Sequence, residues 1–80
     1  MSRARDVVEV VARALADRPD AVRVTERQGK GQTVVELSMA PGDLGRVIGR
    51  QGRTAAAIRT LVTLAAELDG TKATVDFRDE

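Results

Sequence analysis

The stretch Gly45–Arg59, which reads GRVIGRQGRTAAAIR, constrains what this chain can fold into more than any other part of it. Its glycines Gly49 and Gly52 stand three residues apart, between two segments whose apolar residues recur at helical spacing. Glycine adopts backbone conformations that other residues avoid, so the pair predicts a sharp turn that joins two helices. Four arginines and no acidic residue lie in the same stretch, and we therefore expect a local positive charge around the turn.

The chain before this turn divides into one helical and two alternating segments. Over 4–17 the apolar residues recur at i, i+4 and i+8, which predicts an amphipathic helix that Pro19 ends. Apolar and polar residues alternate over 21–28 and again over 32–39, and the flexible segment Gly29–Gly31 separates them. This pattern predicts a β-hairpin with a longer loop. The residues expected on buried faces are Val7, Val8, Val11, Ala12, Leu15, Val22, Val24, Val35, Leu37 and Met39.

From the turn onward, the sequence predicts two helices and a last strand. A short helix starts at Pro41–Asp43 and stops at Gly49, and a longer helix runs from near Gly52 to Gly70. Alternation over 71–78 predicts the strand. The residues expected on the apolar faces of these three elements are Leu44, Val47, Ile48, Ile58, Leu61, Val62, Ala65, Leu68, Ala73, Val75 and Phe77.

The resulting order, α-β-β-α-α-β, predicts an α+β fold in which three helices pack on one face of a three-stranded sheet. Eighty residues form a single domain, 1–80, with room for one core. Cysteine and histidine are absent, which excludes disulfides, thiolate nucleophiles and the usual zinc sites. A domain of this size often gains stability from a partner, so we keep contact with another chain as an expectation.

Charge and composition exclude several classes of function. The net charge is only +1, and Phe77 is the one aromatic residue, which argues against modules that stack bases on aromatic platforms. No apolar run approaches the roughly 20 residues that a membrane helix needs. The acidic residues show no pairing that suits acid–base catalysis, and Asp43 reads as a helix cap. We expect no enzyme activity, no cofactor, no small-molecule substrate and no membrane contact, and the cysteine-free chain fits the cytoplasm.

The helix that follows the turn offers a site for phosphate. The first N–H groups of a helix lack intrahelical partners and carry the positive end of its dipole, so an anion binds there readily. Arg50 and Gln51 on the turn would face the backbone of a nucleic acid. The same glycine pair also fits a helix cap and a tight turn that bind nothing. Arg59 is expected to be an ordinary solvated helix residue.

The sequence VIGRQGRTAAAIR, with glycines at 49 and 52, resembles the signature of KH domains, and the element order resembles their type II arrangement. Over nearly the whole chain, the similarity is greatest to small single-domain bacterial RNA-binding proteins of the KhpA type. This resemblance implies that about four nucleotides of single-stranded RNA are clamped at the turn. The bases would lie in a groove between the turn and a sheet edge, with Val35, Val47 and Ile48 as candidates for its floor. The RNA-binding residues that it implies are Arg46, Val47, Ile48, Gly49, Arg50, Gln51, Gly52 and Arg53.

The KhpA resemblance also implies partners and a cellular role. From it we expect a homodimer, or a heteromer with a larger KH protein of the KhpB type. The implied role is that of an RNA chaperone in post-transcriptional regulation, with links to cell shape and cell-wall biogenesis. The alternative is a protein-interaction and dimerisation module with little RNA binding of its own, in which Ala56, Ala57 and Leu64 pack against a second copy.

Overall fold

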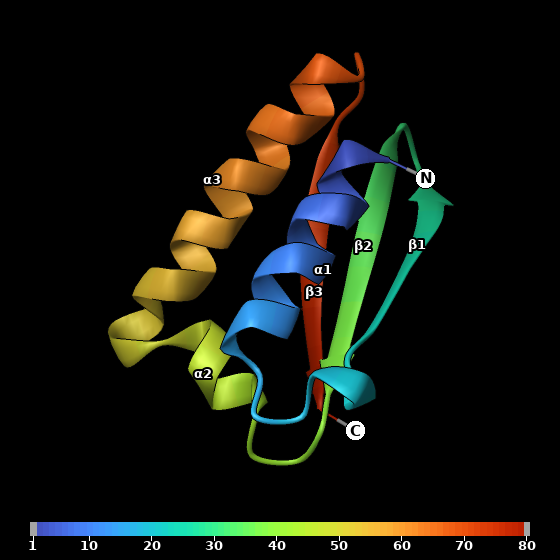
Figure 1. Ribbon diagram of the computed structural model, residues 1–80. Helices are drawn as coiled ribbons and strands as arrows, with labels where there is room; N and C mark the ends of the chain where they lie inside the picture. The colour runs from blue at the N-terminus through green and yellow to red at the C-terminus, as the bar shows by residue number, and fades with distance from the viewer. Residues whose placement is uncertain (1, 80) are drawn as a thin grey trace.

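Three helices lie on one face of a three-stranded sheet in the computed structural model, which describes residues 2–79 (Figure 1). The predicted α+β fold and its α-β-β-α-α-β order are confirmed, with two single-turn 3-10 segments, η1 and η2, added. The elements are α1 Arg3–Leu15, η1 Pro19–Ala21, β1 Arg23–Gly29, β2 Gln32–Met39, α2 Leu44–Ile48, η2 Arg50–Gly52, α3 Arg53–Leu68 and β3 Ala73–Asp79.

Helix α1 begins at a side-chain cap. Ser2 is extended, and its hydroxyl oxygen accepts a hydrogen bond from the backbone N–H of Arg5 at 3.1 Å, which satisfies one of the free donors of the first turn. The helix ends at Leu15, two residues before the predicted end at position 17, because Ala16 is already extended with ψ 141°. Its buried residues, Ala4, Val8 and Ala12, recur every four residues and face the sheet.

The sheet has the order β1-β2-β3, with β1 antiparallel and β3 parallel to the central strand β2. Gly29 pairs with Gln32, which leaves only Lys30 and Gly31 in the hairpin turn, so the predicted longer loop is wrong. A φ of +74° at Gly31 allows this tight connection. Because parallel strands need a crossover, α2, η2 and α3 together connect β2 to β3. The turn between α2 and α3 therefore lies beside the carboxyl ends of these two strands (Figure 1).

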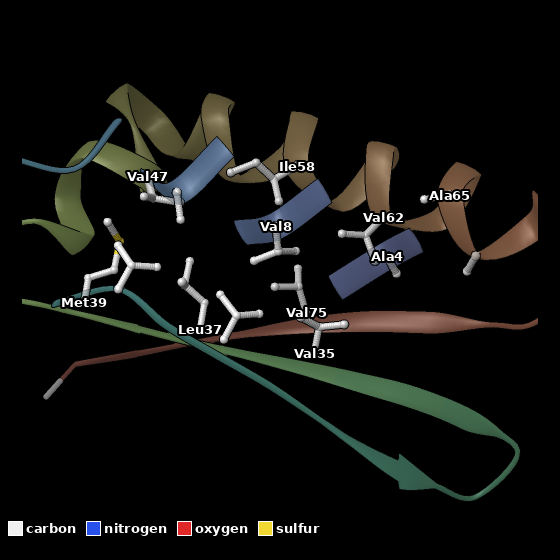
Figure 2. Packing of buried hydrophobic residues seen from close by; sticks show 14 residues of the cluster. Ala4, Val8, Val35, Leu37, Met39, Val47, Ile58, Val62, Ala65 and Val75 are labelled. Atoms are coloured by element: carbon white, nitrogen blue, oxygen red, sulfur yellow. The ribbon is translucent and has the colours of Figure 1, made fainter. Parts of the chain in front are cut away.

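The core lies between the helices and the sheet (Figure 2). Each of the three helices contributes to it, with Val8 from α1, Val47 from α2 and Val62 from α3 all 1% exposed or less. The strands contribute the alternating residues that the sequence predicts. The core residues of the strands are Val24, Val35, Leu37, Met39 and Val75, with Ala73 and Phe77 packed at its margin.

Two residues predicted for the α3 core stripe lie outside the core. Leu61 is 45% and Leu68 is 75% exposed, so their assignment to the core is wrong. Helix α3 turns a narrower row toward the sheet, made of Ala55, Ile58, Val62, Ala65 and Ala66. Leu15, at the last residue of α1, is also partly exposed, at 37%. The periodicity identified the helices correctly, but it overestimated the width of the faces that they bury.

Candidate nucleic-acid interface

The turn between α2 and α3 combines three residues in left-handed backbone conformations. The φ angles are +76° at Gly49, +57° at Gln51 and +72° at Gly52. The N–H of Gly49 donates to the Gly45 carbonyl at 2.9 Å, and the N–H of Gly52 donates to the Gly49 carbonyl at 3.1 Å. Gln51 is the one residue other than glycine with positive φ in the described chain, and such conformations cluster at binding sites.

The two glycines of the turn are required for different reasons. A Cβ atom on Gly49 would overlap the Thr54 side chain, lying 2.8 Å from its Cβ and closer still to its hydroxyl oxygen. A Cβ atom on Gly52 would meet nothing within 4 Å, so only its φ of +72° favours glycine. Thr54 therefore packs directly against the start of the turn and holds α2 and α3 close together.

Two of the four arginines stand free on the turn. Arg50 and Arg53 are exposed, and neither of their side chains has a hydrogen-bond or ion-pair partner among residues 2–79. Gln51, between them, is exposed as well. No side chain caps the start of α3, and the backbone N–H of Arg53 donates to the Arg50 carbonyl. The turn thus presents two unpaired guanidinium groups at the positive end of a 16-residue helix.

Arg46, by contrast, already has acidic partners. Its Nη2 lies 2.8 Å from Oδ2 of Asp17, and its Nε lies 3.8 Å from Oδ1 of Asp43. Asp17 follows α1 and is 29 positions away in the sequence, so no local pattern could have revealed this pair. The positive charge of Arg46 is partly neutralised, and the local field comes mainly from Arg50 and Arg53.

Asp43 serves a different purpose from the predicted one. It occupies the position before α2, but its side chain makes no capping hydrogen bond to that helix. Instead Oδ2 accepts a hydrogen bond from the backbone N–H of Arg18 at 3.0 Å, and the residue is only 5% exposed. This nearly buried carboxylate ties the segment between α1 and β1 to the start of α2.

The three residues predicted for the apolar floor of the RNA groove differ in how exposed they are. Ile48 is half-buried and reaches the surface at the end of α2. Val47 is fully buried and packs in the core beneath the turn. Val35 is also fully buried, in the middle of β2, so its assignment to the floor of an open groove is wrong. Ile48 is therefore the one apolar side chain of the three that is accessible.

Arg59 is not the freely solvated residue that the sequence predicts. Its Nη1 donates to the Val75 carbonyl of β3 at 2.9 Å, and its guanidinium lies 5.0 Å from the centroid of the Phe77 ring. That distance suits a cation–π interaction. Since β3 is an edge strand, this pair places a cation and an aromatic ring together at the border of the sheet. The contact joins residues 16 and 18 positions apart, and sequence reasoning missed it.

A match to a known protein family identifies the family to which this chain belongs. A family model for the KH domain of KhpA and KhpB matches residues 5–77. This chain belongs to the KhpA/KhpB KH-domain family. That family is non-enzymatic, so the chain is not an enzyme.

Curated relatives match the chain over most of its length. It is 43% identical to the RNA-binding protein KhpA of Aquifex aeolicus, over 96% of this chain and 98% of the relative. It is 54% identical to the RNA-binding protein KhpA of Caldanaerobacter subterraneus, over 76% of this chain and 81% of the relative. The similarity to KhpA that the sequence suggested is therefore confirmed.

A solved structure shares the fold. Era in complex with MgGDPNP and nucleotides 1506–1542 of 16S ribosomal RNA superposes with a TM-score of 0.65 at 19% identity. The match covers 95% of this chain but 29% of that one, so the resemblance is to one part of Era. It supports the type II KH fold of the present chain.

Neither a metal site nor a membrane span emerges from the described residues. Within 2–79, no three or more acidic side chains gather in a way that could hold a metal ion. None of the helices in that range is long and apolar enough to cross a membrane.

Proposed function

We propose that this chain binds single-stranded RNA by clamping its phosphate backbone at the turn Gly49–Gly52. The observation that carries the proposal is the pair of unpartnered, exposed arginines, Arg50 and Arg53, at the uncapped start of α3. A helix start of this kind attracts phosphate, and guanidinium groups bind phosphate oxygens in a bidentate manner. The curated relatives named RNA-binding protein KhpA support RNA as the ligand.

The turn and its arginines would contact the sugar–phosphate backbone of the RNA. Glycines at both ends keep side chains away from the ligand, and Gln51 projects from the turn between the two arginines. Next to the turn, Ile48 offers a small apolar surface to a base. Few groups are placed to read base edges, so we expect weak sequence preference.

The salt dependence of binding should reflect the number of free cations. Each neutralised phosphate of a single strand contributes about −0.7 to the slope of log K against log salt. Three phosphates, one for each of the arginines 46, 50 and 53, would give a slope of roughly −2. Because Arg46 is occupied by Asp17 and Asp43, we expect two phosphates and a slope of roughly −1.4.

Membership of the KhpA/KhpB family supports more specific proposals about the cellular role. We propose that the chain acts in the cytoplasm as an RNA chaperone in post-transcriptional regulation. We also propose that it associates with a second copy or with a KhpB-type KH protein. Any effect on cell shape and cell-wall biogenesis would then depend on that partnership.

Fluorescence anisotropy with a short labelled single-stranded RNA tests the clamp across a salt series. The double variant Arg50→Asp plus Gln51→Asp should lose binding, because it places two carboxylates where phosphates would lie. A matched control is Arg23→Asp plus Gln28→Asp, which changes the same residue types at two exposed positions of β1. Circular dichroism checks that both variants fold. Equal binding by the turn variant and the wild type would refute the clamp.

A further inference from the structure

Arg59 of α3 is exposed, yet contacts with β3 hold its guanidinium in place. Its Nη1 donates to the Val75 carbonyl at 2.9 Å, and the guanidinium lies 5.0 Å from the centroid of the Phe77 ring. Within residues 2–79 the Arg59 side chain makes no other hydrogen bond and no ion pair. A guanidinium carries five N–H donors and no acceptor, so most of the donors of Arg59 stay available to a ligand.

The carbonyl that holds Arg59 lies on the free edge of the sheet. Just before β3, the Lys72 carbonyl accepts a hydrogen bond from the Thr33 N–H at 2.8 Å and so points toward β2. Backbone groups alternate in direction along a strand, so those of Val75 point away from β2, where the described sheet has no further strand. Val75 is nevertheless only 5% exposed. A ligand at the middle of this edge therefore meets the Arg59 guanidinium and not the strand backbone.

Arg59 lies within reach of a nucleotide that is held at the turn. It follows Gly52 by close to two full helical turns, which places it on the same side of α3 and about 10 Å along the helix axis. Strand β3 packs against both α2 and α3, so its edge runs beside the turn that joins these helices. A phosphate bound at Gly49–Gly52 would thus bring a neighbouring base to Arg59.

The chemistry of a guanidinium discriminates among bases. Two parallel N–H donors match a base edge with two adjacent acceptors, and guanine offers this pair in O6 and N7. Adenine carries the N6 amino group beside N7, so one of the two hydrogen bonds is replaced by a contact between donors. The contacts of Arg59 with β3 restrict its orientation before a base arrives, so little conformational freedom is lost on binding.

We propose that Arg59 reads one base of the bound RNA and prefers guanine to adenine at that position. This inference rests on the clamp at Gly49–Gly52 and adds a specificity-determining residue outside that turn. A single reading residue gives a preference at one base and leaves the rest of the strand unselected. If Arg59 served only to join α3 to β3, two RNAs that differ in this one base would bind alike.

Anisotropy titrations with two labelled RNAs, UUUGUUUU and UUUAUUUU, test the preference. The wild type should bind the guanine strand about fivefold more tightly. Arg59→Lys keeps the charge but loses the planar pair of donors, so the two strands should bind almost equally. Arg53→Lys is the matched control, because it makes the same change at the turn and should keep the ratio of the two affinities even where both fall. Circular dichroism checks that both variants fold.

Base analogues identify the atoms that are read. Inosine keeps O6 and N7 but lacks the exocyclic amino group, so it should bind like guanine, whereas 7-deazaguanine lacks N7 and should bind like adenine. Equal binding of the two strands by the wild type, or a preference that survives Arg59→Lys or the loss of N7, would overturn the role of Arg59 and leave the clamp standing. A wild type that binds neither strand would refute the clamp, and this inference with it.

Discussion

The two ends of α3 differ in whether their polar groups have partners within the protein. At the C-terminal end, the N–H groups of Asp69, Gly70 and Thr71 donate to helix carbonyls, and the Asp69 carboxylate pairs with Arg3. At the N-terminal end, no side chain caps the helix, and the arginines on the turn have no partner within the described chain. The C-terminal end uses its polar groups to stabilise the fold, whereas the N-terminal end leaves them available to a ligand.

Backbone geometry alone does not distinguish these ends. Gly52 has φ +72° and Gly70 has φ +70°, and at either position a Cβ atom would meet nothing within 4 Å. Both glycines therefore serve a left-handed turn next to the same helix. What separates a structural turn from a binding turn here is the presence of unpaired cations and uncapped N–H groups.

The largest effect on stability is expected at Gly49. Gly49→Ala places a Cβ atom against Thr54 and forces alanine into a φ of +76°, so unfolding should require about 3 kcal/mol less than in the wild type. Urea denaturation followed by circular dichroism measures this. Gly70→Ala, which meets no neighbour, is the control and should cost about 1–2 kcal/mol. Equal losses in both variants would show that the Thr54 contact does not constrain the turn.

Gly52→Ala and Gly70→Ala test the difference between the two ends of α3 directly. Similar φ angles and similar free space predict similar losses of stability, about 1–2 kcal/mol each. Only Gly52→Ala should weaken RNA binding, by about tenfold, since it alone alters the turn that holds Arg50 and Arg53; tenfold corresponds to about 1.4 kcal/mol. Anisotropy titrations at one salt concentration measure the affinities. If both variants bind RNA like the wild type, the turn geometry is not part of the clamp.

Asp17 should weaken RNA binding at the N-terminal end of α3, because its carboxylate forms an ion pair with Arg46. Asp17→Asn removes this acidic partner and frees the guanidinium for phosphate, so RNA affinity should rise about two- to fivefold at low salt, and the salt slope should steepen by about 0.7. Asp20→Asn is the matched control, because Asp20 lies on the same surface segment and makes no ion pair with Arg46. An equal gain from both substitutions would mean that only net charge matters.

The sequence predicted most of the fold because the fold rests on local periodicity. The alternation in β1, β2 and β3 and the helical recurrence in α1 and α3 each identified their element and most of its buried residues. The glycine pair predicted the sharp turn, and its φ angles confirm that prediction. Leu61 and Leu68 were misassigned because the width of the buried face depends on where α1 lies against α3, which no local pattern encodes.

The electrostatics of the site were predicted less well, for a related reason. The four arginines of Gly45–Arg59 look equivalent in sequence, yet the structure separates them by distant partners. Arg46 forms an ion pair with Asp17, which follows α1, and Arg59 donates a hydrogen bond to a backbone carbonyl of the edge strand β3. Of these four, only Arg50 and Arg53 have side chains without a hydrogen-bond, ion-pair or ring contact within the described residues. Such long-range contacts follow from topology, and they determine which cations remain for a ligand.

The smallest predicted effect is the pH dependence of stability at the C-terminal end of α3. The backbone N–H of Arg3 donates to Asp69, and with the Arg3 guanidinium it holds the pKa of that carboxyl below its ordinary 3.8. A depressed pKa in the folded state means that the stabilisation is fully present above the ordinary value and is lost as the pH falls through the lowered one. Asp69→Asn should therefore lower the melting temperature slightly at neutral pH, and the gap to the wild type should close in the acidic range below pH 3.8. Asp20→Asn serves as the control. A gap that stays constant across this range would show that Asp69 acts through its hydrogen bonds alone and not through its charge.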